Sequence, residues 1–524
     1  MAEAVRAAYR AGQEDETLEP LVRVNGNGQP VGCIQEGDYV IFYDLRGERE
    51  IELTSALVER DFPHFSRPLR GVPLVTMIEY HPRLDVRIAF PPLGPVQDTL
   101  CETVSKAGLH QLKIAESEKA IHIGYFLNGK SQEAFPGEER IIIPSPHGVG
   151  FTEMPPQMRA SAVADAAIEA VRDPRYALVI VNLCNVDVIG HIENRDAIRI
   201  AIETVDAQTG RILEAAQAAG VTTVLTADHG TVERWYYPDG TVDTGHTTSP
   251  VPLIVIDPEL GQKVRLRPGG ALTDVAPTVL HLLGLSPPAV MTGRSLIPAI
   301  PSPASGASTM RSRRVLLLIL DGWGIGKGDA GDLIAQANPP VMNHLLAVWP
   351  HTQLDASGSA VGLPPGTVGN SEAGHLHLGA GRVIPADRVR INQALEDGSF
   401  YENEAFLWAM RGARQDGTRL HLLGIVSFYS SHGSVDHLLA LLKMARQERV
   451  PEVYIHAMLG RRGERPESGA VYVEQVERET ERLGVGQVAT VIGRFWSLDR
   501  EGHWDRIEKT YRMLVEGRGF PVGQ

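Results

Sequence analysis

The sequence predicts an α/β fold with two α/β domains, one of which carries a largely parallel central sheet. Short apolar segments without polar alternation are typical of strands buried on both faces. These segments alternate with helically spaced ones, which favours parallel strands joined by helices. The length of 524 residues exceeds what one hydrophobic core usually holds, so we expect two domains. The predicted strands are Tyr176–Leu183, Val221–Ala227, Val251–Ile256, Arg314–Leu320, Leu420–Val426 and Val453–Leu459, and the predicted helices are Pro156–Val171 and Asp196–Ala219.

One segment between these elements has the composition of a linker. Pro298–Ser312 is rich in Pro, Ser, Ala and Gly and lacks apolar periodicity. Met310 lies just before a basic run and a predicted buried strand. This arrangement suggests that an ancestral start codon lies inside a fusion.

Charge and composition narrow the classes of partner. The net charge of −14 excludes a non-specific nucleic-acid surface, which needs a basic stripe. The basic residues are mostly arginines, which suit phosphates and carboxylates. Three scattered cysteines argue against a disulfide framework, and the longest strongly apolar run, Val315–Leu320, is too short to span a bilayer. We therefore expect a soluble, cytoplasmic monomer that binds a small anionic substrate, with no nucleic-acid or membrane partner.

Acidic and histidine residues follow several predicted strands. Asp187 and His191 come after the first, and Asp228 and His229 after the second. Carboxyl ends of parallel strands are where α/β folds bind ligands. Asp187 and His191, four residues apart, can share one ion if the loop is helical, whereas adjacent Asp228 and His229 more naturally serve two ions. The two remaining clusters contain Asp243 and His246 before a strand and Asp321 after one. Each alone is equally consistent with a turn or cap residue.

A serine flanked by glycines completes the set. Ser371 lies in the segment GNSEAGH, where a strand-to-helix turn would present its hydroxyl openly. Taken alone, Ser371 is better interpreted as a helix N-cap, with Glu372 in the first turn. Together with the acid and histidine clusters it predicts a nucleophile for phosphoryl transfer.

These motifs resemble the metal core of the alkaline phosphatase superfamily, and nearly the whole chain resembles the cofactor-independent (2,3-bisphosphoglycerate-independent) phosphoglycerate mutase family in circularly permuted order. Residues from 314 to about 520 resemble the family's first half and residues 4 to about 297 its second. The resemblance implies an alkaline-phosphatase-like metal domain and a smaller phosphotransferase domain. The implied boundaries are 1–75 and 389–524 for the phosphotransferase domain, 76–297 and 314–388 for the metal domain, and 298–313 for the linker.

The resemblance also implies two divalent ions and a phosphoserine intermediate. One ion would be held by Asp187, His191 and His246, and the other by Asp321, Ser371, Asp228 and His229. Oxygen and imidazole ligands without thiolates favour Mn²⁺, with Zn²⁺ or Mg²⁺ as alternatives. The implied catalytic residues are Ser371, Lys119 and His432, and the implied substrate-binding residues are Arg46, Arg49, Arg462, Arg494 and Arg500. An exposed ion pair is the alternative for any single arginine.

Two substrate loops depart from the family pattern. In residues 427–437, Phe428 and Ser434 replace an acidic residue and a histidine. In residues 459–468, Gly463 replaces an aspartate proposed to help proton transfer, and Glu464 is a possible substitute. We therefore expect interconversion of 2- and 3-phosphoglycerate. The alternatives are transfer of a phosphoryl or phosphonyl group on another small hydroxy acid, as in phosphonate metabolism, and a non-catalytic binding protein.

Overall fold

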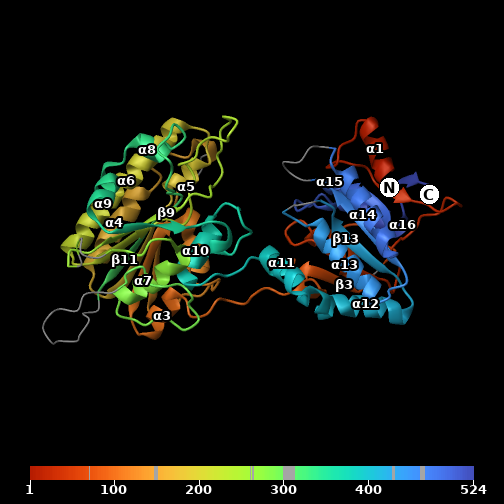
Figure 1. Ribbon diagram of the computed structural model, residues 1–524, viewed down its shortest axis with the longest axis horizontal. Coiled ribbons are helices and arrows are strands. Elements are labelled where there is room, and N and C mark those ends of the chain that lie inside the picture. The colour runs from red at the N-terminus through yellow and green to blue at the C-terminus, as the bar shows by residue number, and fades with distance from the viewer. Residues whose placement is uncertain are drawn as a thin grey trace. The chain divides into compact units, whose positions relative to one another are not determined.

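A computed structural model describes residues 1–523 except 70, 147–150, 260, 262–264, 299–312, 428–430 and 461–466. The chain divides into two compact units. Unit 1 comprises Met1–Pro92 and Arg390–Gln524, and unit 2 comprises Leu93–Val389. The chain therefore passes from unit 1 to unit 2 and back, and unit 1 is built from both ends of the sequence (Figure 1).

Unit 1 contains a mainly parallel sheet with the strand order β16-β1-β15-β14-β13-β2-β3-β4 among the described residues. Only the β1–β15 pair of this sheet is antiparallel. Its strands are β1 Leu21–Arg23, β2 Tyr39–Phe42, β3 Leu74–Ile78, β4 Arg87–Phe90, β13 Leu420–Ile425, β14 Val453–Leu459, β15 Gln487–Gly493 and β16 Phe520–Val522. Its helices are α1 Ala2–Arg10, α2 Ile51–Val58, α11 Asp387–Asp397 (which begins before the boundary), α12 Glu404–Asp416, α13 Val435–Gln447, α14 Gly469–Leu483, α15 Arg494–Ser497 and α16 Trp504–Glu516, with a 3₁₀ turn at Ser399–Glu402.

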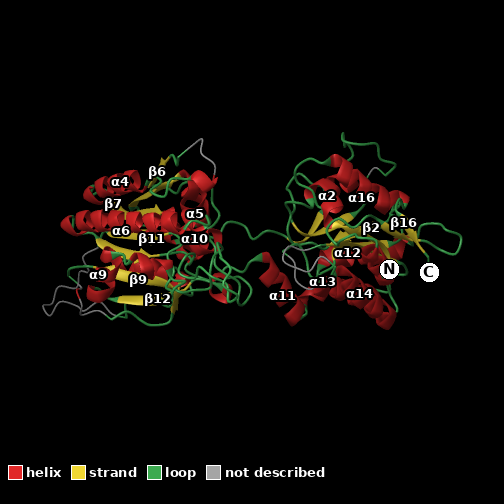
Figure 2. Ribbon diagram, turned by 90° about the horizontal axis from the view of Figure 1, so that it is seen from above, coloured by secondary structure: helices red, strands yellow, loops and turns green. Residues whose placement is uncertain are grey.

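Helices cover both faces of this sheet. Because successive strand residues point to opposite faces, neighbouring residues of one strand pack into different cores. Ile41 packs with the core under α12, α13 and α14, whereas Val40 and Phe42 pack with the core under α2 and α16. Figure 2 shows strands β2 and β16 of unit 1 between these two helical layers. Burial on both faces explains the continuous apolar strands of the sequence.

Unit 2 contains a second sheet, with the order β10-β12-β9-β8-β11-β7-β5-β6. Strands β6, β5, β7, β11 and β8 are parallel neighbours, and β9 is antiparallel to both β8 and β12. Its strands are β5 His110–Glu116, β6 Glu138–Ile143, β7 Tyr176–Leu183, β8 Thr222–Thr226, β9 Val251–Ile256, β10 Gly270–Ala271, β11 Val315–Leu320 and β12 His351–Asp355. Its helices are α3 Leu100–Lys106, α4 Ala160–Arg172, α5 Asn185–Gly190, α6 Arg195–Ala218, α7 Val275–Leu282, α8 Leu333–Ala337, α9 Pro340–Val348 and α10 Ser371–Ala380; shorter turns are Ser117–Lys119, the π-helix His122–Phe126, Phe151–Glu153, Leu272–Asp274 and Gly358–Val361.

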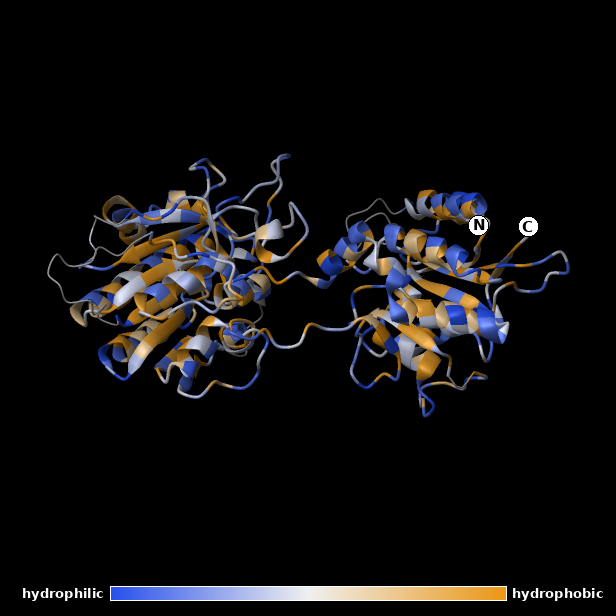
Figure 3. Cartoon of the chain, turned by 60° about the horizontal axis from the view of Figure 1, so that its bottom comes forward, coloured by the Kyte–Doolittle hydropathy of each residue, from blue (hydrophilic) through white to orange (hydrophobic). Residues whose placement is uncertain are grey.

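The apolar strands form the centre of each unit. Figure 3 shows hydrophobic strands inside and hydrophilic residues on the outer faces of the helices. Strand β11 is buried along its whole length and pairs with β7 on one side and β8 on the other. A segment near residue 315 is thus inserted between strands that are consecutive in sequence. No helix among the described residues is long and apolar enough to cross a membrane.

The predicted α/β fold of two domains, one with a largely parallel central sheet, is confirmed, and the sheet of unit 1 is mainly parallel as well. One predicted boundary differs from the structure. The sequence placed a domain boundary between residues 75 and 76, but β3 and β4 continue the unit 1 sheet beyond β2. The unit therefore extends to Pro92. The predicted linker Pro298–Ser312 lies almost wholly outside the described residues.

Candidate metal centre and active site

Adjacent strands of unit 2 bring the predicted site residues together. In the order β8-β11-β7-β5, all neighbours are parallel, so their carboxyl ends meet at one edge. Beyond these ends lie Asp228 and His229 after β8, Asp321 after β11, Asp187 and His191 after β7, and Lys119 after β5. This edge is where parallel α/β sheets place ligands.

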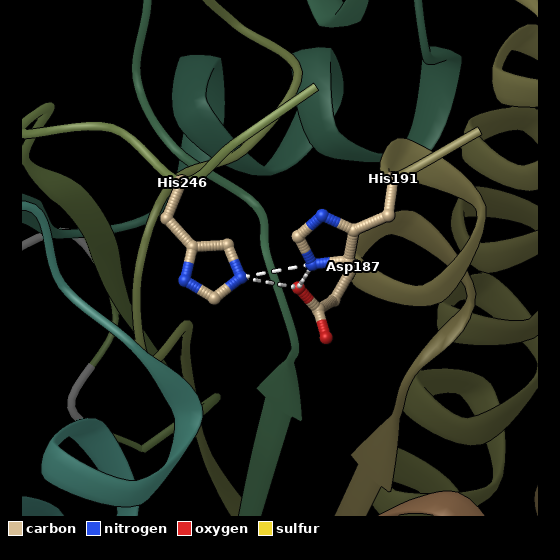
Figure 4. Close-up of side chains that lie close together, drawn as sticks. All are labelled: Asp187, His191 and His246. Atoms are coloured by element: carbon tan, nitrogen blue, oxygen red, sulfur yellow. Dashed lines mark hydrogen bonds and ion pairs between the residues drawn. The ribbon is translucent and has the colours of Figure 1, made fainter. Parts of the chain in front are cut away.

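Asp187, His191 and His246 form the first cluster (Figure 4). Helix α5 winds the loop after β7, so Asp187 and His191 project from one face four residues apart. His246 Nε2 lies 3.1 Å from Asp187 Oδ1 and 3.1 Å from His191 Nε2. His191 Nδ1 lies 2.7 Å from the carbonyl of Thr244, and His246 Nδ1 lies 2.9 Å from that of Gly369. A carbonyl only accepts, so each Nδ1 carries the proton and each Nε2 directs a lone pair at the other.

Ser371 lies at the second cluster, as the first residue of α10. Its Oγ is 3.0 Å from His229 Nε2 and donates to Asp321 Oδ1 over 3.3 Å. The helix N-cap is Asn370, whose side chain accepts from Ala373 N at 2.8 Å. The simpler interpretation of Ser371 as an N-cap is therefore wrong, because Asn370 fills that role and leaves the serine hydroxyl in the cluster.

His229 and Asp228 both border this second cluster. His229 Nε2 lies 3.5 Å from Asp228 Oδ2, 3.5 Å from Asp321 Oδ1 and 3.7 Å from Asp187 Oδ1. Among the described residues, Asp228 Oδ2 has no hydrogen-bond partner, although it is fully buried. These distances permit Asp228 and His229 to bind the same ion.

Lys119 connects the two clusters. Its buried Nζ donates to Asp187 Oδ2 at 2.6 Å, to Asp321 Oδ1 at 2.8 Å and to Ser371 Oγ at 2.6 Å. Burial opposes the Lys119 charge, but the carboxylates of Asp187 and Asp321 outweigh it and raise the lysine pKa well above its usual value. Lys119 is therefore a cation at neutral pH and directs a donor at the serine oxygen.

The two carboxylates that Lys119 contacts have pKa values shifted in opposite directions. Burial raises the pKa of Asp187, yet the charge of Lys119, together with the neighbouring rings of His191 and His246, holds it well below its usual range. Burial also raises the pKa of Asp321, and the neighbouring charge of Asp228 adds to the rise. Several acidic groups in one buried site need cationic partners.

Two further residues belong to this region, and sequence reasoning gave neither a role. His375, one helical turn after Ser371, places Nδ1 3.2 Å from Asp228 Oδ2, and Asn182 Nδ2 donates to Asp321 Oδ2 at 2.8 Å. Asp228, Asp321 and His375 form a third group able to hold a metal. Both residues stand inside motifs that the sequence analysis singled out. Their spacing from Ser371 and Asp187 was the available signal.

The predicted substrate residues of unit 1 also lie near one another. Glu48 Oε2 pairs with Arg46 Nη2 at 3.3 Å and with Arg500 Nη1 at 2.7 Å. Arg49 Nη1 donates to the carbonyl of Leu498 at 3.2 Å. Arg494 pairs with Glu16 at 3.1 Å. Arg462 lies outside the described residues, as do Phe428, Gly463 and Glu464.

His432 also lies in unit 1 and is buried, with 3% of its surface exposed. Its Nδ1 lies 2.6 Å from Glu50 Oε1. Burial lowers the pKa of His432 to about 4, and the charges of Arg494, Arg46 and Arg49 act in the same direction. The ring is therefore neutral at neutral pH and able to accept a proton.

The side chains of unit 2 fit divalent metal ions. Among the described residues, the Nε2 lone pairs of His191 and His246, the carboxylates around them and the Asp228 oxygen without a hydrogen-bond partner are placed to bind such ions. Their donor set of carboxylate, imidazole and hydroxyl contains no sulfur, as hard or borderline ions require.

Comparison with known proteins agrees with this class of site. Residues 42–287 match the Metalloenzyme superfamily. Residues 1–82 and 391–522 match the BPG-independent PGAM N-terminus. The metalloenzyme and phosphoglycerate mutase resemblances are thus both supported.

Individual relatives carry the corresponding name. The chain is 42% identical over 299 residues to a 2,3-bisphosphoglycerate-independent phosphoglycerate mutase of Syntrophotalea carbinolica, covering 56% of this chain and 57% of the relative. It is 43% identical over 305 residues to the enzyme of that name from Thermomicrobium roseum, covering 57% of each. The chain thus spans a little over half the length of these relatives. A solved structure of Leishmania mexicana phosphoglycerate mutase at low cobalt concentration aligns over 53% of each chain, with 29% identity and a TM-score of 0.38.

Proposed function

We propose that this chain transfers a phosphoryl group through Ser371 and so interconverts 2- and 3-phosphoglycerate. The observation that carries the proposal is the position of Ser371 Oγ, in hydrogen-bond contact with Lys119, His229 and Asp321. A nucleophile needs a proton acceptor and a stabiliser for its developing charge. Asp321 is the proton acceptor, and Lys119 stabilises the developing charge. The mutase name of the relatives supports the choice of reaction.

The residues act in two half-reactions. Ser371 gives its proton to Asp321, and Oγ attacks phosphorus while the bond from phosphorus to the substrate oxygen breaks and that oxygen takes a proton from solvent. Lys119 donates to the oxygen that loses the proton. In the second half-reaction the other hydroxyl of the glycerate takes the phosphoryl group, and Ser371 recovers a proton. His432, a neutral imidazole, is the proposed acceptor of that hydroxyl proton.

Two divalent ions complete the proposal, with Mn²⁺ as the first choice and Zn²⁺ or Mg²⁺ as alternatives. Asp187, His191 and His246 would hold one, and Asp321, Ser371, Asp228 and His229 the other, with His375 as a further candidate. When bound, such ions lower the pKa of a serine hydroxyl and offset the charge on a transferring phosphoryl group.

The substrate that fits unit 1 is a small phospho-hydroxy acid. Arg46, Arg49, Arg494 and Arg500 are the proposed ligands of its phosphate and carboxylate, because guanidinium groups bind both bidentately. Glu48 already pairs with Arg46 and Arg500, which indicates that these two arginines accept a carboxylate between them. Arg462 stays a sequence-based prediction. The alternative acceptor rests on Phe428, Ser434 and Gly463, and the named relatives favour phosphoglycerate over it.

We also propose that the chain is a circular permutation of the mutase order. The insertion of β11 between β7 and β8 supports it, as does the match of one N-terminal family region to residues 1–82 and 391–522. A rearranged chain that starts at Arg313, runs to residue 523, continues through a Gly/Ser linker into residues 1–297 and ends there tests this. Retained folding and turnover are expected, and an unfolded rearranged chain would contradict it.

An assay with purified, Mn²⁺-loaded protein tests the function. 3-Phosphoglycerate is supplied and enolase reports the 2-phosphoglycerate that forms. Turnover that requires metal and is lost in Ser371→Ala, but not in the half-buried control Ser131→Ala, supports the proposal. No turnover by metal-loaded wild-type protein overturns it in favour of another hydroxy acid.

A further inference from the structure

Unit 1 contains a buried acid–imidazole cluster at the carboxyl end of its sheet. Asp44 follows β2, His432 follows β13, and Glu50 is the residue that precedes α2. Asp44 and Glu50 are fully buried and His432 is nearly so. The backbone joins the segments as well, because Leu45 N donates to the carbonyl of His432 at 2.6 Å.

Glu50 is held in a fixed orientation against the imidazole. Its Oε1 lies 2.6 Å from His432 Nδ1, and its Oε2 accepts from Arg49 N at 3.1 Å. A carboxylate placed on one ring nitrogen fixes the tautomer and orients the ring. Because Nδ1 faces Glu50, Nε2 is the nitrogen that we assign to proton exchange with a substrate.

Asp44 is the second buried carboxyl group of this cluster. Its Oδ1 accepts from Ile425 N at 2.8 Å, while its Oδ2 has no partner among the described residues. Burial and the charge of neighbouring Glu50 raise the pKa of the Asp44 carboxyl well above its usual value. Two buried carboxyl groups in contact keep at least one proton, because two adjacent buried charges repel. A proton on Asp44 Oδ2 makes this oxygen, which otherwise only accepts hydrogen bonds, a donor to Glu50.

Two glycines leave space for the Asp44 carboxylate. A Cβ at Gly424 would lie 2.7 Å from Asp44 Oδ1, and one at Gly433 would lie 2.9 Å from it. Any side chain at either position would displace the carboxylate. The sequence therefore keeps a cavity for this buried acid, which contributes nothing to the apolar core and is costly to bury without a role.

Charges around the cluster favour a neutral imidazole. Arg46, Arg49 and Arg494 lower the pKa of His432, after burial as the largest cause, and Asp44 opposes them. Burial raises the pKa of Asp44 well above its usual value and that of Glu50 to about 8, and a positive charge on His432 lowers the pKa of Glu50 again. The charged groups near His432 are thus these three arginines and the carboxyl pair.

We propose that Glu50 and Asp44 are positioning residues that orient His432 and stabilise its charged form, so that Nε2 exchanges a proton with the substrate hydroxyl. This inference rests on the proposed function. As the hydroxyl oxygen attacks the phosphoserine, its O–H bond breaks and an Nε2–H bond forms, which gives an imidazolium. Glu50 offsets that charge through the Nδ1–H hydrogen bond, and Asp44 donates to Glu50. In the reverse half-reaction, Nε2 returns the proton.

The test compares Glu50→Gln and Asp44→Asn in the Mn²⁺-loaded full chain. Glu50→Gln lowers kcat about 100-fold while KM for 3-phosphoglycerate changes less than about threefold. Its acidic limb in the pH–kcat profile moves to lower pH, because an imidazolium without its counter-charge loses its proton more readily. Asp44→Asn keeps kcat within about tenfold, since the amide also donates to Glu50.

The matched control is Asp38→Asn. Asp38 precedes β2 at its other end and pairs with buried His421, with Oδ2 3.1 Å from Nε2. It is a buried Asp–His pair of the same sheet, and its loss leaves kcat and the pH profile unchanged. If Glu50→Gln behaves like Asp38→Asn in an active enzyme, the inference is wrong.

A spectroscopic readout separates this inference from the proposed function. In ¹⁵N-histidine-labelled protein, the His432 signal, assigned by its loss in His432→Gln, should show a protonated Nδ1 above about pH 8, where Glu50 is ionised, and Glu50→Gln should change the tautomer ratio. An Nδ1 without a proton in the wild-type protein overturns the inference. A protonated Nδ1 with no phosphoglycerate turnover leaves the hydrogen bond intact and overturns the proposed reaction instead.

Discussion

His191 Nε2 lies 3.1 Å from His246 Nε2, and the Nδ1 of each ring faces a backbone carbonyl. Two lone pairs at this distance repel unless both bind the same cation. Asp187 Oδ1, 3.1 Å from His246 Nε2, adds a third donor at the same point. The backbone therefore fixes both rings in the tautomer that a metal ion requires.

Loss of one ring should remove one metal ion. His246→Ala should lower the bound metal by about one ion per chain and reduce turnover by at least roughly 100-fold, since even the partners that orient a metal ligand are worth 10–100-fold. Metal content is measured by elemental analysis after reconstitution with Mn²⁺. The exposed residue His351 provides the control, and His351→Ala should retain both ions and full turnover. Equal metal content in both variants would contradict the assignment of His246.

Lys119 should contribute more to the unfolding free energy of the metal-free protein than to that of the metal-bound protein. Lys119→Met leaves Asp187 and Asp321 buried without their cation, which costs about 3–5 kcal/mol of unfolding free energy. Mn²⁺ should recover part of that loss, because it neutralises the same carboxylates. Urea unfolding with and without Mn²⁺ measures both values. Lys106→Met, which breaks an exposed pair with Asp98, should leave the unfolding free energy close to that of the wild-type protein in either state.

The N-cap of α10 should affect both stability and catalysis. Asn370→Ala removes the acceptor for Ala373 N and costs about 1 kcal/mol. Because Ser371 is the next residue, its hydroxyl also loses a fixed position, and kcat should fall more than KM changes. Asn370→Asp, which keeps an acceptor, should restore stability. A fall in stability without any change in kcat would show that the cap does not position Ser371.

The low pKa of His432 predicts a pH dependence of stability. Burial lowers the pKa of this ring to about 4, so the unfolded chain binds more protons than the folded one between about pH 6.5 and 4. The stabilising contribution of the neutral ring is present above pH 6.5 and is lost as the pH falls through this window. His432→Gln should therefore lose roughly 3 kcal/mol less than wild type between pH 7 and 4. Urea unfolding of unit 1 at both pH values checks this, with His81→Gln as the exposed control.

Much of the fold followed from the apolar pattern. The predicted strands Tyr176–Leu183, Val251–Ile256 and Val453–Leu459 have the observed bounds, because strands buried on both faces leave a continuous apolar signal. The boundary near residue 75 was harder to predict. Strand β4 is short and only partly buried, so its sequence does not reveal that it completes the unit 1 sheet.

The site was predictable where residues follow strong strands. Asp187, Asp228 and Asp321 all come directly after buried strands, and sheet order brings them together. His375 and Glu50 were not predicted. Their roles depend on which side chains face them across the fold, and local sequence carries no record of that pairing. The cluster of Asp44 with Glu50 and His432 joins residues from the two ends of the chain.

The most direct test of the account is phosphorylation of Ser371. Mn²⁺-loaded protein is mixed with 3-phosphoglycerate, quenched in acid and analysed by peptide mass spectrometry, alongside Ser371→Ala. The account predicts a phosphate on the peptide that contains Ser371, 2-phosphoglycerate in the supernatant, and neither in the variant. Turnover by Ser371→Ala at the wild-type rate would contradict it.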